Sequence, residues 1–106
     1  MIDKSQEKTL FLEKLNALDL EPIAWQLLYS SRSQGWSFEK VLGTIAAYKR
    51  FLFFHYLYPN RALAPTDDVD LVWHCHILDT QKYVDDCQWL FGRIVHHYPY
   101  PTDHAA

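Results

Sequence analysis

The residues of this chain that could do chemistry are concentrated in segment 67–79, which reads DDVDLVWHCHILD. This segment holds four aspartates, two histidines and a cysteine among apolar residues. Imidazole nitrogens and carboxylate oxygens are ligands for zinc, iron and manganese ions in proteins. The same groups also serve as general bases or as buried hydrogen-bonded groups. The segment therefore indicates a metal site, a catalytic site or a structural polar network.

The secondary structure of segment 67–79 decides which of its side chains can act together. On a strand, His74 and His76 would point to the same side and could chelate one ion. On a helix these two residues lie about 200° apart, whereas Asp70 and His74 share a face. The preceding letters PTDD are typical of a helix start, because threonine caps helices and aspartates favour the first turn. The helical interpretation is therefore favoured.

The predicted metal ligands are Asp70, His74, His76 and His97. A site of this composition would suit a zinc, iron or manganese ion. On the helical interpretation, His76 lies on the core-facing side, so the alternative role for it is a buried neutral histidine with a hydrogen-bond partner. For His55 and His96 we expect structural roles.

The charge distribution bears on partners and location. The net charge is −3 and the pI about 6.0, and residues 66–91 hold six aspartates against one lysine. Such a segment attracts cations and repels phosphate, so we expect no nucleic-acid partner. The longest apolar run, residues 51–58, is too short to cross a bilayer, and the first residues do not resemble a signal peptide. We expect a cytoplasmic protein without membrane contact, with Cys75 and Cys87 as free thiols.

Helical periodicity runs through most of the chain. We predict a single all-α domain over residues 1–106, bundle-like, with a proline-broken tail from 95 to 106. The expected helices are 6–18, 22–29, one from a Ser37 cap to about residue 58, 66–78 and 80–91, with Thr66 and Asp79 as further N-caps. Gly43 inside the third of these helices suggests a close neighbour.

A longer motif extends from segment 67–79 to His97. It reads Asp-x-x-Trp-His-x-His, followed by a tyrosine, an Asp-Cys pair, Phe-Gly and a histidine. The matching residues are Asp70, Trp73, His74, His76, Tyr83, Asp86, Cys87, Phe91, Gly92 and His97. The motif resembles the glycine-rich domain-containing protein-like family. This resemblance implies that Asp70, His74, His76 and His97 form one unit, and that the chain is a short stand-alone bacterial member.

Two functions of different classes fit these observations. In the first, the chain is a small metal-binding protein in which Asp70, His74 and His97 bind the ion with His76 nearby, and hydrolytic or oxidative chemistry follows. In the second, it is a metal-free helical module that binds another protein, and its histidines are structural. Neither the residues nor the resemblance names a reaction, so whether the chain is an enzyme stays open.

Overall fold

The computed structural model of the protein describes residues 2–29 and 35–98. Within these residues the chain forms five α-helices and no strand. They are α1 (Lys4–Ala17), α2 (Glu21–Tyr29), α3 (Phe38–Leu57), α4 (Asp67–Leu78) and α5 (Thr80–Phe91). The predicted all-α class is therefore confirmed, and the strand interpretation of segment 67–79 is excluded.

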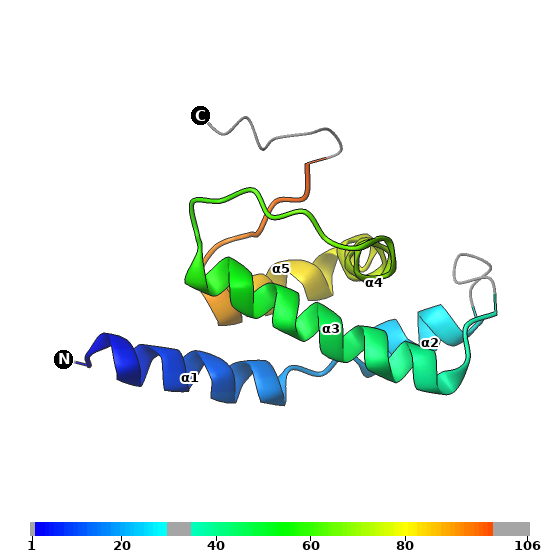
Figure 1. Ribbon diagram of the computed structural model, residues 1–106, viewed down its shortest axis with the longest axis horizontal. Coiled ribbons are helices and arrows are strands. Elements are labelled where there is room, and N and C mark those ends of the chain that lie inside the picture. Colours follow the sequence, from blue (N-terminus) through cyan, green and yellow to red (C-terminus); the bar gives the residue numbers. More distant parts are fainter. Residues whose placement is uncertain (1, 30–34, 99–106) are drawn as a thin grey trace.

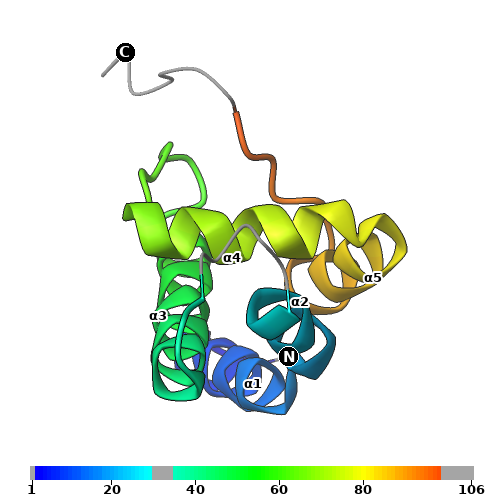
Figure 2. The ribbon, with the colours of Figure 1, turned by 90° about the vertical axis from the view of Figure 1, so that its right-hand side faces the viewer.

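The helices form one globule around α3 and α4. Figure 1 shows α1 and α3 running alongside each other, with α5 behind α3 and α4 seen end-on. In Figure 2, α4 lies across α2 and α3 and continues through Asp79 into α5. In the same view (Figure 2), the connection from α3 to α4 and the segment that follows α5 lie on the side of α4 that is turned away from α2. Residues of both segments line a cleft together with Trp73 of α4.

Local capping explains where the helices begin. Ser37 and Thr66 cap α3 and α4 as predicted, each accepting a hydrogen bond from the backbone N–H three residues on, at 3.1 and 3.3 Å. α1 begins before the predicted start, because Asp3 and Gln6 form a capping box. Asp79 occupies the predicted N-cap position of α5, but its side chain makes no capping hydrogen bond. This residue is the C-cap of α4 and the link to α5 at once.

The core combines side chains from all five helices. Its members include Phe11, Leu15, Ile23, Leu27, Val41, Leu52, Val72 and Leu90. Cys75 and Cys87 are both buried in the same core, and no disulfide joins them. Gly43 does not mark a close neighbour, because a Cβ at this position would meet nothing within 4 Å. Of the helices described, none is long and apolar enough to cross a membrane.

Candidate metal centre

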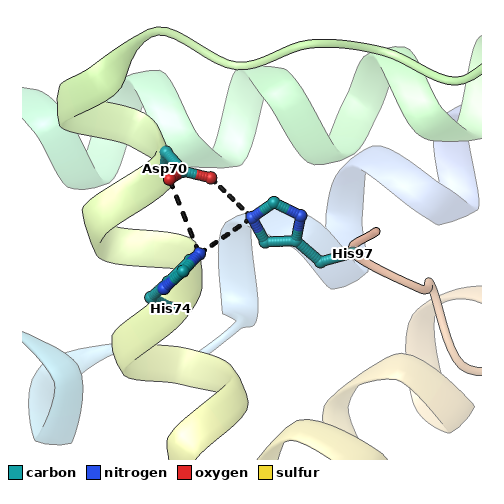
Figure 3. A group of neighbouring side chains, drawn as sticks. All are labelled: Asp70, His74 and His97. Atoms are coloured by element: carbon teal, nitrogen blue, oxygen red, sulfur yellow. Dashed lines mark hydrogen bonds and ion pairs between the residues drawn. The ribbon is translucent and has the colours of Figure 1, made fainter. Parts of the chain in front are cut away.

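The structure brings together Asp70, His74 and His97, which are three of the four predicted ligands (Figure 3). Asp70 and His74 lie one turn apart on α4, and His97 comes from the segment after α5. His97 Nε2 lies 2.5 Å from Asp70 Oδ1, and His74 Nε2 lies 3.5 Å from Asp70 Oδ2. The two Nε2 atoms are 3.1 Å apart. Three potential ligand atoms therefore point at one small volume.

The position of His97 depends on contacts far from it in sequence. Gly92 ends α5 in the left-handed conformation, with φ of 72°, which turns the chain back towards α4. Trp73 Nε1 then donates to the Tyr83 hydroxyl at 2.9 Å, and that hydroxyl donates to the carbonyl of Val95. The His97 ring stacks on the Trp73 indole, with ring centroids 4.0 Å apart. The segment that carries His97 is thus fixed on α4 by both polar and aromatic contacts.

Protons alone cannot satisfy all three contacts of this cluster. A carboxylate only accepts hydrogen bonds, and each ring nitrogen either donates or accepts. Whichever nitrogens are protonated, at least one of the three contacts brings two lone pairs or two N–H groups together. A cation among Asp70, His74 and His97 would accept a lone pair from each. The cluster is therefore chemically better matched to an ion than to a closed hydrogen-bond network.

The distances and exposure of the cluster suit an open metal site. Zinc binds nitrogen and oxygen at about 2.0–2.2 Å, which places tetrahedral ligand atoms roughly 3.3 Å apart. The observed separations of 2.5, 3.1 and 3.5 Å bracket that value. The His74 side chain is 54% exposed and that of His97 15%. One side of the cluster therefore faces solvent, where a water or a substrate could complete the coordination.

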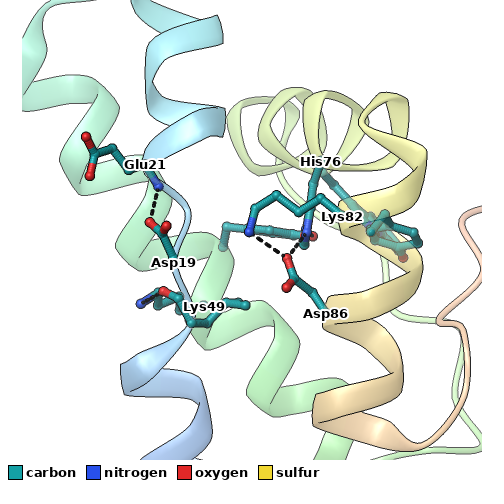
Figure 4. A network of polar contacts seen from close by, with 10 residues as sticks. Asp19, Glu21, Lys49, His76, Lys82 and Asp86 are labelled. Atoms are coloured by element: carbon teal, nitrogen blue, oxygen red, sulfur yellow. Dashed lines mark hydrogen bonds and ion pairs between the residues drawn. The ribbon is translucent and has the colours of Figure 1, made fainter.

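The fourth predicted ligand, His76, lies apart from the other three, with both ring nitrogens engaged elsewhere. Its Nδ1 contacts the Tyr48 hydroxyl at 2.7 Å and its Nε2 contacts Asp86 Oδ2 at 2.8 Å. Because a carboxylate cannot donate, Nε2 donates to Asp86 and Nδ1 accepts from Tyr48. Figure 4 shows His76 and Lys82 both reaching Asp86. His76 is 1% exposed, and this burial lowers its pKa even though the bond to Asp86 opposes the shift.

The remaining described histidines stay outside the cluster. His55 is buried on α3, where burial, followed by the charges of Arg93 and His97, lowers its pKa to about 4. Its Nε2 has no hydrogen-bond partner in the described part of the chain. His96 is exposed beside the Tyr98 ring. The part of the predicted tail beyond residue 98, which includes His104, lies outside the described residues.

A cleft of about 450 Å³ adjoins the cluster, with His97 and Trp73 among its lining residues. The connection from α3 to α4 forms much of the lining, and residues 93–98 form most of the rest. Sequence reasoning missed this cleft, because two loops that are distant in sequence make it. The proline-bounded stretch PNRALAP was the one available signal, since prolines at both ends of a loop restrict its backbone.

The fold and the cluster define a small all-α protein with an aspartate and two histidines converging at its surface. Residues 15–102 match a family model described as UCP032817-like, so the chain belongs to the UCP032817-like family. The chain is also 34% identical over 107 residues to Glycine-rich domain-containing protein 1 of Arabidopsis thaliana. The resemblance to the glycine-rich domain-containing protein-like family is thereby confirmed.

The match to the Arabidopsis thaliana protein covers 91% of this chain and 13% of that relative. The chain therefore spans a small part of the relative's length, and what the whole relative does is a separate question. A bacterial origin stays a prediction. No solved structure gives a significant match to this chain.

Proposed function

We propose that this protein binds a divalent metal ion through Asp70, His74 and His97. The observation that supports this proposal most strongly is the convergence of the three ligand atoms, which lie within 4.8 Å of one another. His76 has a different role in this proposal: it is a buried group that fixes α4 against α3 and α5. Zinc, iron and manganese are the candidate ions, because all three accept nitrogen and carboxylate ligands.

Three protein ligands leave coordination positions open on the solvent side of the cluster. Catalytic zinc sites commonly have three protein ligands and a water, and sites with two histidines and one carboxylate also hold iron(II). A bound ion would supply Lewis acidity to a ligand in an open position. The chain's own contribution is to orient the two imidazoles. The position of His74 on α4 fixes its direction, and stacking on the Trp73 ring fixes the orientation of the His97 ring. Hydrolytic or oxidative chemistry belongs to this proposal and depends on which ion is bound.

Calorimetric titration of protein purified without a nickel column tests this proposal. Zinc, manganese and anaerobic iron(II) are added separately to the full chain and to the variants His74→Ala and Asp70→Asn. We expect one ion per chain for the natural sequence and at least a tenfold loss of affinity in each variant. Affinity should also fall as the pH is lowered, because protons compete with the ion for imidazole nitrogens.

His96→Ala is the matched control, since His96 is an exposed histidine next to a ligand but outside the cluster. This variant should bind metal as the natural chain does. Because the His74 side chain is largely exposed, His74→Ala should fold with nearly unchanged stability. The proposal fails if no ion binds, or if His96→Ala weakens binding as much as His74→Ala.

A metal-free function is the second candidate, and one feature favours it. Asp70 and His97 already form a short contact at 2.5 Å, and His97 stacks on Trp73. These contacts alone could serve to hold residues 93–98 on α4 as part of a helical interaction module. On this alternative, none of the three ions binds, and substitutions of Asp70 or His74 change only the melting temperature.

A further inference from the structure

The cleft beside the candidate metal centre is lined by positive and neutral groups and by no carboxylate. Arg61 enters from the connection between α3 and α4, and Arg93 from the segment after α5. In the described part of the chain, neither arginine forms an ion pair with an aspartate or a glutamate. Arg61 lies over the Tyr58 ring and Arg93 over the Phe91 ring. Within the described residues, both guanidinium groups at this cleft therefore lack a carboxylate partner.

His55 provides a second, independent indication of a ligand. This residue lines the cleft, is 8% exposed, and its Nε2 has no hydrogen-bond partner in the described residues. A buried polar atom without a partner destabilises the fold, so such atoms are rare unless a ligand or water pairs with them. A polar group of a bound molecule would remove this cost.

The remaining lining is largely apolar and sets the character of the ligand. Leu63, Val95 and the Trp73 ring line the cleft together with alanine and proline side chains. A volume of about 450 Å³ lies within the usual range of small-molecule sites, roughly 300–1,000 Å³. Arginine suits a planar anion in particular, because its fork of N–H groups matches the two oxygens of a carboxylate.

We propose that this cleft binds a small organic carboxylate with an apolar body. Arg61 and Arg93 hold the carboxylate, and the body lies against Trp73 and Leu63. The inference deepens the proposed function, because His97 belongs both to the cleft lining and to the three metal ligands. A metal ion at that cluster would add positive charge at the edge of the cleft and strengthen carboxylate binding.

Titration of benzoate into the metal-free full chain, followed by NMR, tests this inference at about pH 7.5. Benzyl alcohol, which has a similar body and no charge, is the matched ligand control. We expect saturable shifts with benzoate, much weaker binding of benzyl alcohol, and contacts between the benzoate ring and the Leu63 methyl groups. Arg61→Gln and Arg93→Gln should each weaken benzoate binding at least fivefold.

Arg50→Gln is the matched protein control, because Arg50 is an exposed arginine on α3 that does not line the cleft. It should leave benzoate binding unchanged. The inference is overturned if benzoate does not saturate, if benzyl alcohol binds as well, or if Arg50→Gln weakens binding as much as the two cleft variants. Circular dichroism of each variant confirms that it is folded before titration.

Repeating the titration with one equivalent of zinc separates this inference from the proposed function. If benzoate binds the metal-free chain in the expected way and zinc does not bind at all, the metal proposal falls and the carboxylate site stands. If zinc binds through Asp70 and His74 and neither form binds benzoate, the carboxylate site falls and the metal proposal stands.

Discussion

Removing the His76 ring should destabilise the protein, because it breaks a buried hydrogen bond to Tyr48. The energy of this interaction can be measured with a double-mutant cycle. His76 is fully enclosed, and its Nδ1 accepts from the Tyr48 hydroxyl, which is itself fully buried. Burial raises the pKa of Tyr48 well above its usual range, with smaller contributions from Tyr83, Cys87 and Asp86. The hydroxyl therefore stays protonated and requires an acceptor, which in this fold is the imidazole.

The magnitude follows from what each substitution leaves unpaired. Tyr48→Phe strands the Nδ1 of His76 and should cost about 1–3 kcal/mol. His76→Ala strands the Tyr48 hydroxyl and also opens a cavity, so it should cost about 3–5 kcal/mol. In the double variant neither group is left without a partner. Its cost should therefore be smaller than the sum of the two single costs by about 1–3 kcal/mol.

Urea unfolding at neutral pH, followed by circular dichroism and tryptophan fluorescence, gives the three free energies. Tyr29→Phe is the control, since Tyr29 is 75% exposed and the change should stay within about 0.5 kcal/mol. Single costs that add to within about 0.3 kcal/mol in the double variant would refute the reasoning. They would mean that Tyr48 and His76 are not paired in solution.

Two further predictions concern pH and glycine. Because burial lowers the pKa of His55 to about 4, the unfolded chain binds the proton first as the pH falls below 6.5. The free energy of unfolding should therefore fall by about 1–2 kcal/mol between about pH 6.5 and 4, once solvent screening beside the open cleft is allowed for. Urea unfolding of His55→Leu should show a weaker dependence on pH than that of the natural chain. An equal dependence in the two proteins would contradict this prediction. Gly43→Ala should stabilise α3 by about 0.5–1 kcal/mol, because a Cβ meets open space there, whereas Gly92→Ala should destabilise by about 1 kcal/mol at its positive φ. Melting temperatures that move in the same direction for these two variants would refute the second prediction.

The helices could be predicted from the sequence because their signals are local. Apolar residues at helical spacing define them, and Ser37 and Thr66 cap α3 and α4 through bonds that span only three residues. The errors have local reasons too. The capping box of Asp3 and Gln6 starts α1 before the predicted residue 6, and the glycine at position 43 gives a false signal of close packing.

The candidate site was predictable only where its geometry is helical. Asp70 and His74 share a face because they are four residues apart, and the same 100° rotation per residue separates His74 from His76. The placement of His97 is different in kind. It depends on the left-handed conformation of Gly92 and on the stacking of the His97 ring on Trp73. Neither feature follows from helical periodicity.

The family motif carries this long-range information in its residue types. Trp73 bonds to Tyr83, and His97 contacts Asp70, so motif residues on α4 pair with motif residues that follow it. His76 and Asp86 form another such pair. A single sequence shows the residues of these pairs but not which of them meet. The cleft is hard to predict for the same reason, since two loops create it and the sequence shows only the proline-bounded stretch of one of them.

The ring nitrogens of the histidines provide the most direct test of the central claim. A long-range ¹H–¹⁵N spectrum reports each imidazole nitrogen separately, and one equivalent of zinc is added to the metal-free full chain. The Nε2 signals of His74 and His97 should shift together, while those of His55 and His76 stay in place. The claim is contradicted if His74 and His97 do not respond, or if zinc moves the signals of His96 and His104 instead.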